Sequence, residues 1–250
     1  IGALANSNAT VAVSCTGTED MNSREVPVLA CCLGEAGETR GDVPRIAYDG
    51  EDADNDAVEG VVMVQGLETR ARELLQAGVP RVFLGEAALK DASAVERLAA
   101  DFGVARIGVY AAARRMNVNW GLDTISNADF RFMMPSRCEP CWEILGPSGS
   151  PTGTELGWWV GEMYKLGASA ALVRADVLDD SDLNLLAVLT DRHGERLWFG
   201  PLDDTEPRLE DWIDLAGVRR FALPSALVER MAGVLARDAL SFIIPTNTCE

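Results

Sequence analysis

The sequence contains little positive charge. Lysine occurs only at Lys90 and Lys165 and histidine only at His193, and the 39 acidic residues outnumber the 22 lysines and arginines, which gives a formal net charge of −17. Nucleic acids and anionic membranes are polyanions that select basic surfaces. We therefore exclude nucleic acid and the membrane surface as general partners and expect a soluble, acidic protein.

Long apolar runs are also missing. No stretch of the sequence reaches the roughly 18 apolar residues that a membrane span requires, so we expect no membrane-spanning segment. The six cysteines do not form the pattern of a secreted disulfide framework, because four of them are close neighbours, at Cys31, Cys32, Cys138 and Cys141. This usage favours a reducing, cytoplasmic setting.

Cys138 and Cys141 have the C-x-x-C spacing of a metal or redox pair. A zinc site would need Cys31 and Cys32 to complete it, but adjacent cysteines are poor tetrahedral ligands and the sequence has no second C-x-x-C pair. We therefore expect loop thiols, with no metal and no cofactor. A zinc site and a redox pair at Cys138 and Cys141 are the alternatives.

What the sequence does contain is a repeating strand-helix pattern. Residues 61–64 are an unbroken apolar run, as expected of a strand that is buried on both faces of a parallel sheet. Leu67, Ala71 and Leu75 follow at helical spacing, and residues 81–84 form a second apolar run. This is a βαβ unit, and the chain after it repeats the pattern.

The remaining strands are less evenly marked. Four more are expected, at residues 107–110, 170–173, 196–199 and 219–223. Candidates for the first two are residues 10–14 and 26–32, although the linkers around them are too short for full crossover helices. A length of 250 residues is typical of one (β/α)8 barrel. We predict an α/β fold, a single TIM-barrel domain over residues 1–250 with an atypical N-terminal quarter.

A long insertion is expected between the fifth and sixth strands, at residues 120–153. Long loops at the C-terminal end of a barrel often build or cover the functional site. The same loop could instead be a docking surface, which exposed side chains at Met133, Met134 and Trp142 would favour.

The stretch VQGLET, followed by VFLGEAALKDASAVERLAADFG, resembles the third and fourth units of the histidine-biosynthesis barrels HisA and HisF, and the similarity extends over roughly residues 61–231. The resemblance implies a barrel in which turns after strands three, four, seven and eight hold two phosphates through backbone amides and helix N-termini. The positions that match these turns are Gly66, Gly85, Gly200 and Ser225.

These turns depart from the family pattern. The fourth turn has Glu86 where the family has a phosphate-binding threonine, and Pro201 and Pro224 occupy the seventh and eighth turns. Proline removes an amide donor, and a carboxylate beside a phosphate is unfavourable by several kcal/mol unless a cation lies between them. We expect weak phosphate binding at both places.

The resemblance also implies a general acid and a general base, an aspartate on strand one and an aspartate or threonine across the barrel, which together catalyse an aminoaldose-to-ketose rearrangement. Neither candidate for strand one carries an aspartate at the expected place, and Arg174 aligns with the partner residue. We therefore do not expect the isomerase activity.

Other polar residues follow the expected strands and form a candidate site at the C-terminal end of the barrel. Glu86 and Asp176 follow strands four and six and would act as an acid/base pair, with Arg174 or Arg114 orienting an anion. Asp179 lies close by in the sequence. The alternative is that Arg174 forms a structural salt bridge with Asp176 or Glu86.

Three features of the family fail together: the acid/base pair, the glycine turns and the positive charge for phosphate. We therefore expect a divergent HisA-like barrel that is a non-catalytic accessory subunit or binding protein, with a protein partner or a second copy of itself. The alternatives are a barrel acting on a small ligand that is not a bisphosphate, and an isomerase or lyase with relocated acid/base groups. An open mouth lined by Glu86, Arg174 and Asp176 would favour catalysis.

Overall fold

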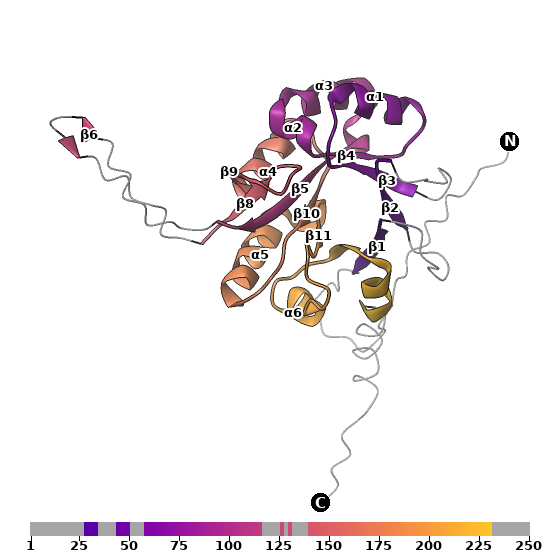
Figure 1. Cartoon of the computed structure of the whole chain (residues 1–250). Helices are drawn as coiled ribbons and strands as arrows, with labels where there is room; N and C mark the ends of the chain where they lie inside the picture. Colours follow the sequence, from indigo (N-terminus) through magenta and orange to yellow (C-terminus); the bar gives the residue numbers. More distant parts are fainter. Residues whose placement is uncertain are drawn as a thin grey trace, which may run out of the picture.

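The computed structural model describes residues 28–34, 44–50, 58–116, 126–127, 130–131 and 140–231. Eight parallel strands form a closed barrel, because β1 pairs with β12 and β10 pairs with β5 (Figure 1). The barrel strands are β1 (Leu29–Leu33), β2 (Arg45–Tyr48), β3 (Val58–Met63), β4 (Val82–Leu84), β5 (Ile107–Arg115), β10 (Ala170–Arg174), β11 (Leu197–Gly200) and β12 (Arg220–Leu223). The predicted (β/α)8 fold is confirmed.

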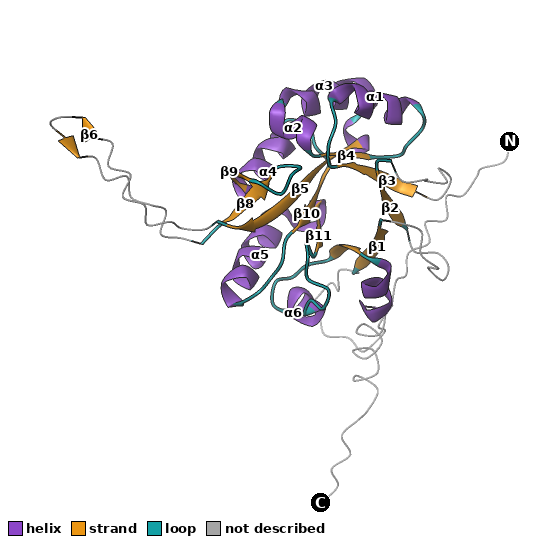
Figure 2. Ribbon diagram, viewed as in Figure 1, coloured by secondary structure: helices purple, strands orange, loops and turns teal. Residues whose placement is uncertain are grey.

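Helices lie around the outside of the barrel (Figure 2). They are α1 (Glu68–Gln76), α2 (Glu86–Lys90), α3 (Ser93–Phe102), α4 (Leu156–Lys165), α5 (Asp180–His193) and α6 (Leu209–Asp214), with 3-10 turns at η2 (Val104–Arg106) and η3 (Gly194–Arg196). A further helix begins at residue 225 and continues to residue 231, where the described chain ends. None of the helices in the described ranges is both long and apolar enough to cross a membrane.

Strands such as β3, β4 and β11 are buried on both faces, which explains their apolar runs. Along β3, Val61 and Met63 pack with the helices in the larger core, whereas Val62 belongs to a second cluster inside the barrel. The same alternation places Phe83 and Tyr110 in the interior cluster. Side chains therefore fill the barrel, and a site can form only at its ends.

The N-terminal quarter differs from the prediction. The first barrel strand is β1, which overlaps the expected 26–32 strand, but the second is β2, which the sequence pattern did not indicate. The other candidate, residues 10–14, lies outside the described residues. β2 was missed because only Ile46 and Ala47 are buried in it, and its ends are Arg45 and Tyr48, so it has neither an apolar run nor a clear alternation.

The insertion after the fifth strand begins with a longer strand than predicted. β5 continues past the barrel to Arg115, where it pairs antiparallel with β8 (Trp142–Leu145), and β8 pairs with β9 (Pro151–Glu155). Two short strands, β6 (Ser126–Asn127) and β7 (Phe130–Arg131), pair with each other. Met133, Met134 and Cys138 lie outside the described residues. The β8–β9 hairpin thus extends the barrel wall at the C-terminal end of β5.

Candidate functional site

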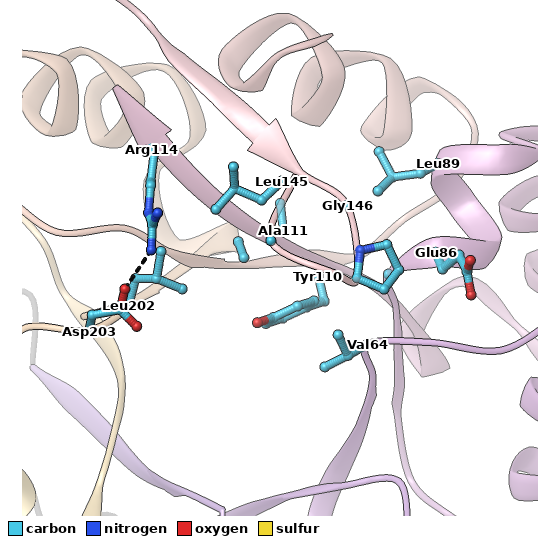
Figure 3. Close-up of a pocket in the computed structure, with 14 residues that line it drawn as sticks. Val64, Glu86, Leu89, Tyr110, Ala111, Arg114, Leu145, Gly146, Leu202 and Asp203 are labelled. Carbon is cyan, nitrogen blue, oxygen red and sulfur yellow. Dashed lines mark hydrogen bonds and ion pairs between the residues drawn. The ribbon is translucent and has the colours of Figure 1, made fainter. Parts of the chain in front are cut away.

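A cavity of about 210 Å³ opens at the C-terminal ends of the barrel strands, and we call it the mouth cavity (Figure 3). Its walls come from the start of α2, the second half of β5, the turn of the β8–β9 hairpin and the loop after β11. The lining residues are Val64, Gly85, Glu86, Leu89, Tyr110, Ala111, Ala112, Arg114, Leu145, Gly146, Pro147, Gly149, Leu202 and Asp203. Glu86 and Arg114 are thus brought to one cavity, whereas Arg174, Asp176 and Asp179 do not line it.

Glu86 begins α2 and is held by two groups of its surroundings. One carboxylate oxygen accepts a hydrogen bond from the backbone N–H of Gly66, at 3.1 Å, and the other pairs with Lys90 Nζ at 2.7 Å. The hydrogen bond from Lys90, and then that from Gly66, lowers the pKa of Glu86. In Figure 3 its carboxylate points away from Tyr110 and Arg114. A general acid or base works best with a pKa near the operating pH, so this environment does not favour acid/base catalysis by Glu86.

Asp176 is held by the loop after β11, residues 201–204, which we call the β11 loop. Its Oδ1 accepts hydrogen bonds from the backbone N–H groups of Leu202, Asp203 and Asp204, at 2.8, 2.9 and 2.9 Å. Successive N–H groups that converge on one point form a typical anion-binding concavity. Here the anion is a side chain of the protein itself.

Arg174, at the end of β10, braces the same loop. Its Nε and Nη2 donate to the carbonyl oxygens of Pro201 and Leu202, at 2.8 and 2.6 Å, and its Nη1 donates to the hydroxyl of Tyr48 at 2.9 Å. These partners differ from the salt bridge to Asp176 or Glu86 that the sequence offered as an alternative. Arg174 and Asp176 together fix the β11 loop, the guanidinium through carbonyl groups and the carboxylate through N–H groups.

Arg114 reaches across the mouth cavity from β5 to the β11 loop. Its Nη2 lies 2.7 Å from Asp203 Oδ2, and the two side chains are 60% and 66% exposed. Exposed ion pairs of this kind contribute about 0–1 kcal/mol. Tyr110 also lines the cavity, and burial raises its pKa to about 12. The tyrosine is therefore a neutral hydroxyl at physiological pH.

Asp179 caps helix α5 and pairs with the end of β5. Its Oδ1 accepts hydrogen bonds from the N–H groups of Ser181 and Asp182, at 2.8 and 3.1 Å, and its Oδ2 pairs with Arg115 Nη1 at 2.8 Å. The hydrogen bond from Arg115 lowers the pKa of Asp179 to about 2. This carboxylate caps the N-terminus of α5 and forms an ion pair with Arg115.

We expect Asp179 to contribute to stability above pH 4 and to lose that contribution as the pH falls through about 2, because the folded state depresses its pKa from 3.8 to about 2. Asp179→Asn keeps a capping oxygen and removes the charge, so its unfolding free energy should fall less steeply than that of the wild type between pH 4 and 2. Urea titrations at each pH measure this. Equal slopes for the two proteins would contradict it.

Asp182 is a buried charged residue of this region that the sequence analysis did not single out. It is only 1% exposed. Its carboxylate accepts hydrogen bonds from Arg115 Nε at 2.9 Å, Trp142 Nε1 at 3.1 Å and the N–H of Leu178 at 3.0 Å. Asp182 therefore fastens α5 to β5 and to the β8–β9 hairpin. One feature of the sequence could have indicated its burial. Asp182 lies four residues before Leu186, which puts this aspartate on the apolar face of the helix.

Trp142 is buried rather than exposed. It is 3% exposed and its ring stacks on Phe199 with the centroids 5.8 Å apart. It therefore offers no surface for docking, in contrast to the exposed aromatic that a docking role for the insertion would need.

The glycines that match the family's phosphate turns are required by the packing of the strands. A side-chain Cβ at Gly85 would lie 2.7 Å from the carbonyl oxygen of Met63, and one at Gly200 would lie 2.1 Å from that of Ala222. Gly66 has a φ of 120°, which favours glycine. Ser225 follows Pro224 at the start of the last helix. Close backbone approach accounts for Gly85 and Gly200 without a ligand.

The C-x-x-C spacing of Cys138 and Cys141 raised a metal site as an alternative. Within the described ranges, no group of three or more histidine, cysteine, aspartate or glutamate side chains is placed to hold a metal ion. Cys141 Sγ lies 3.9 Å from Met116 Sδ. Cys138 lies outside the described residues, so the expectation of loop thiols stays a prediction and the zinc site and the redox pair stay its alternatives.

No protein-family model matches the chain, and no curated protein matches it. The likeness to HisA and HisF thus depends on the residues quoted from the sequence. The eight parallel strands close into a barrel with helices between strands, and at this coarser level the chain has the fold of a (β/α)8 TIM barrel.

Proposed function

We propose that the chain is a divergent HisA-like barrel that acts as a non-catalytic accessory subunit or binding protein. The observation that carries this proposal is the position of Asp176. Its carboxylate accepts hydrogen bonds from three consecutive N–H groups of the β11 loop. A phosphate at this loop would need the same donors and would meet a negative charge.

The other candidate groups support the same proposal. Glu86 is ion-paired with Lys90 and has a lowered pKa, and Asp179 caps a helix. Arg174 holds the β11 loop. The four catalytic candidates that the sequence offered therefore all bind other groups of the protein, which supports a non-catalytic role. We further propose a protein partner or a second copy of this chain, because the acid/base pair, the glycine turns and the positive charge for phosphate are all missing from the family pattern, and a cytoplasmic setting on the basis of the cysteine pattern.

The test of this proposal is the response to phosphate. The purified wild-type chain should show no change in melting temperature with inorganic phosphate or ribose 5-phosphate. Asp176→Ala should unfold about 2 kcal/mol more easily, because three N–H groups lose a charged acceptor. Phosphate at about 100 times its dissociation constant should then restore roughly 2.7 kcal/mol to this variant by binding its folded state. Thermal and urea unfolding measure both effects.

The control is Asp204→Ala in the same loop. Asp204 Oδ1 accepts a local hydrogen bond from the N–H of Glu206 at 2.9 Å and binds none of the N–H groups that hold Asp176, so this variant should not gain a response to phosphate. Stabilisation of the wild type by a sugar phosphate, or its conversion to a product seen by mass spectrometry, would contradict the proposal. A native mass well above 26.9 kDa, or a partner that co-purifies, would support it.

A further inference from the structure

The mouth cavity has an apolar body. Its side walls are formed by Val64, Leu89, Ala112, Leu145, Pro147 and Leu202. Leu145 is buried and the other five are partly exposed, and all six line the cavity. The volume of about 210 Å³ lies below the roughly 300–1,000 Å³ of pockets for drug-sized ligands. A ligand of this cavity is therefore small and largely apolar.

Contacts within the protein hold the walls of the cavity in place. The hairpin that supplies Leu145 and Pro147 is fastened at its base by Trp142, whose Nε1 donates to buried Asp182. The opposite wall, the β11 loop, is held by the hydrogen bonds to Asp176. Both walls are therefore held in place before a ligand binds. Little conformational entropy is then lost on binding, which favours it.

The charges at the cavity are balanced. Arg114 and Asp203 pair at one end, and Glu86 pairs with Lys90 at the other. Figure 3 shows the Arg114–Asp203 pair on the far side of Tyr110 from Glu86. A simple anion would be repelled by the net charge of −17, and a simple cation would meet Arg114. A neutral ligand with one group of each sign fits both charges.

We infer that the mouth cavity binds a small zwitterion with an apolar body, an α-amino acid with an aliphatic side chain. Its carboxylate replaces Asp203 at Arg114, and its ammonium group pairs with the carboxylate of Asp203. The aliphatic side chain lies against Val64, Leu89 and the Tyr110 ring. The Arg114–Asp203 pair can open for this exchange because both side chains are exposed and such a pair is weak. This inference depends on the proposed binding function.

The test is isothermal titration calorimetry of the full chain with L-leucine. Two analogues each lack one charge: 4-methylpentanoate has no ammonium group, and 3-methylbutylamine has no carboxylate. Leucine should bind, and each analogue should bind about tenfold more weakly or worse, because one charge-assisted hydrogen bond is lost. Arg114→Gln and Asp203→Asn should each weaken leucine binding by about the same factor.

Two further variants separate the cavity from a general effect of charge. Ala112→Leu fills the cavity without changing a charge and should abolish binding. Arg208→Gln removes another exposed arginine of an ion pair, that with Asp211, which does not line the cavity, and should leave binding unchanged. Circular dichroism checks that all variants are folded.

Each outcome has a distinct meaning. Leucine binding that is lost in Ala112→Leu and kept in Arg208→Gln supports the site. Absence of binding, or equal binding of leucine and both analogues, overturns this inference and leaves the proposed non-catalytic function standing. Mass spectrometry of the recovered ligand completes the test, because a chemically altered ligand would establish the site and overturn the non-catalytic function.

Discussion

Asp182→Ala is expected to lower the free energy of unfolding by about 3 kcal/mol, because the loss of this buried carboxylate leaves three hydrogen-bond donors without their acceptor, at about 1 kcal/mol or more for each. The carboxylate of Asp182 accepts from Arg115, Trp142 and the N–H of Leu178, and it is almost fully buried. All three donors lose their acceptor in this variant. The stacking of Trp142 on Phe199 should loosen as a result.

Urea unfolding at neutral pH, followed by tryptophan fluorescence, measures the loss. Asp191→Ala on the same helix is the matched control, because Asp191 is exposed and surface substitutions change stability by about 0.5 kcal/mol or less. Trp142→Phe removes the indole N–H together with part of a buried ring, so it should lose more than the roughly 1 kcal/mol of the hydrogen bond alone. If Asp182→Ala were as stable as Asp191→Ala, the buried carboxylate would not be what fastens the hairpin.

Gly200→Ala should destabilise the fold by about 3 kcal/mol or more, because the added methyl group would overlap a backbone atom. A Cβ at this position would lie 2.1 Å from the carbonyl oxygen of Ala222 on β12. A backbone carbonyl cannot move away by a change of rotamer, as a flexible side chain can. β11 and β12 would therefore have to separate. These strands pair only at Phe199 and Phe221.

Thermal and urea unfolding should show this loss equally with and without added phosphate, because the glycine is required for packing. Gly161→Ala is the control, and it should change the stability in the opposite direction. Gly161 lies in α4 with open space where its Cβ would be, so alanine should stabilise the helix by roughly 0.5–1 kcal/mol. A Gly200→Ala protein of wild-type stability that had lost only a ligand would assign the glycine to binding instead.

The strands that the sequence predicted are those with both faces buried. Residues 61–64 form an apolar run because Val62 faces the barrel interior while Val61 and Met63 face the helices. That arrangement leaves a signal in the sequence. β2 leaves none, because it is four residues long and its two ends are half-buried and polar. Its place is set by pairing with β1 and β3, which is a long-range effect.

The candidate site was predicted in part. Strand order places Glu86 and Arg114 at the C-terminal end of the barrel, and both line the mouth cavity. The hydrogen-bond partners of the charged groups could not be predicted from the sequence. Asp176 is held by N–H groups of residues 202–204, and this depends on how the β11 loop turns, for which the local sequence has no distinctive pattern. Burial of Trp142 likewise depends on its contact with Phe199.

The pairing of β1 with β12 also has a consequence for synthesis on the ribosome. Leu29 pairs with Arg220, so β1 has an unpaired edge until nearly the whole barrel has been made. Ribosomes add about 5–20 residues per second, so the interval between the synthesis of β1 and that of β12 is roughly 10 to 40 s. Unpaired strand edges can associate with other chains. The free edge of β1 is therefore open to association with other chains during synthesis, until β12 has emerged.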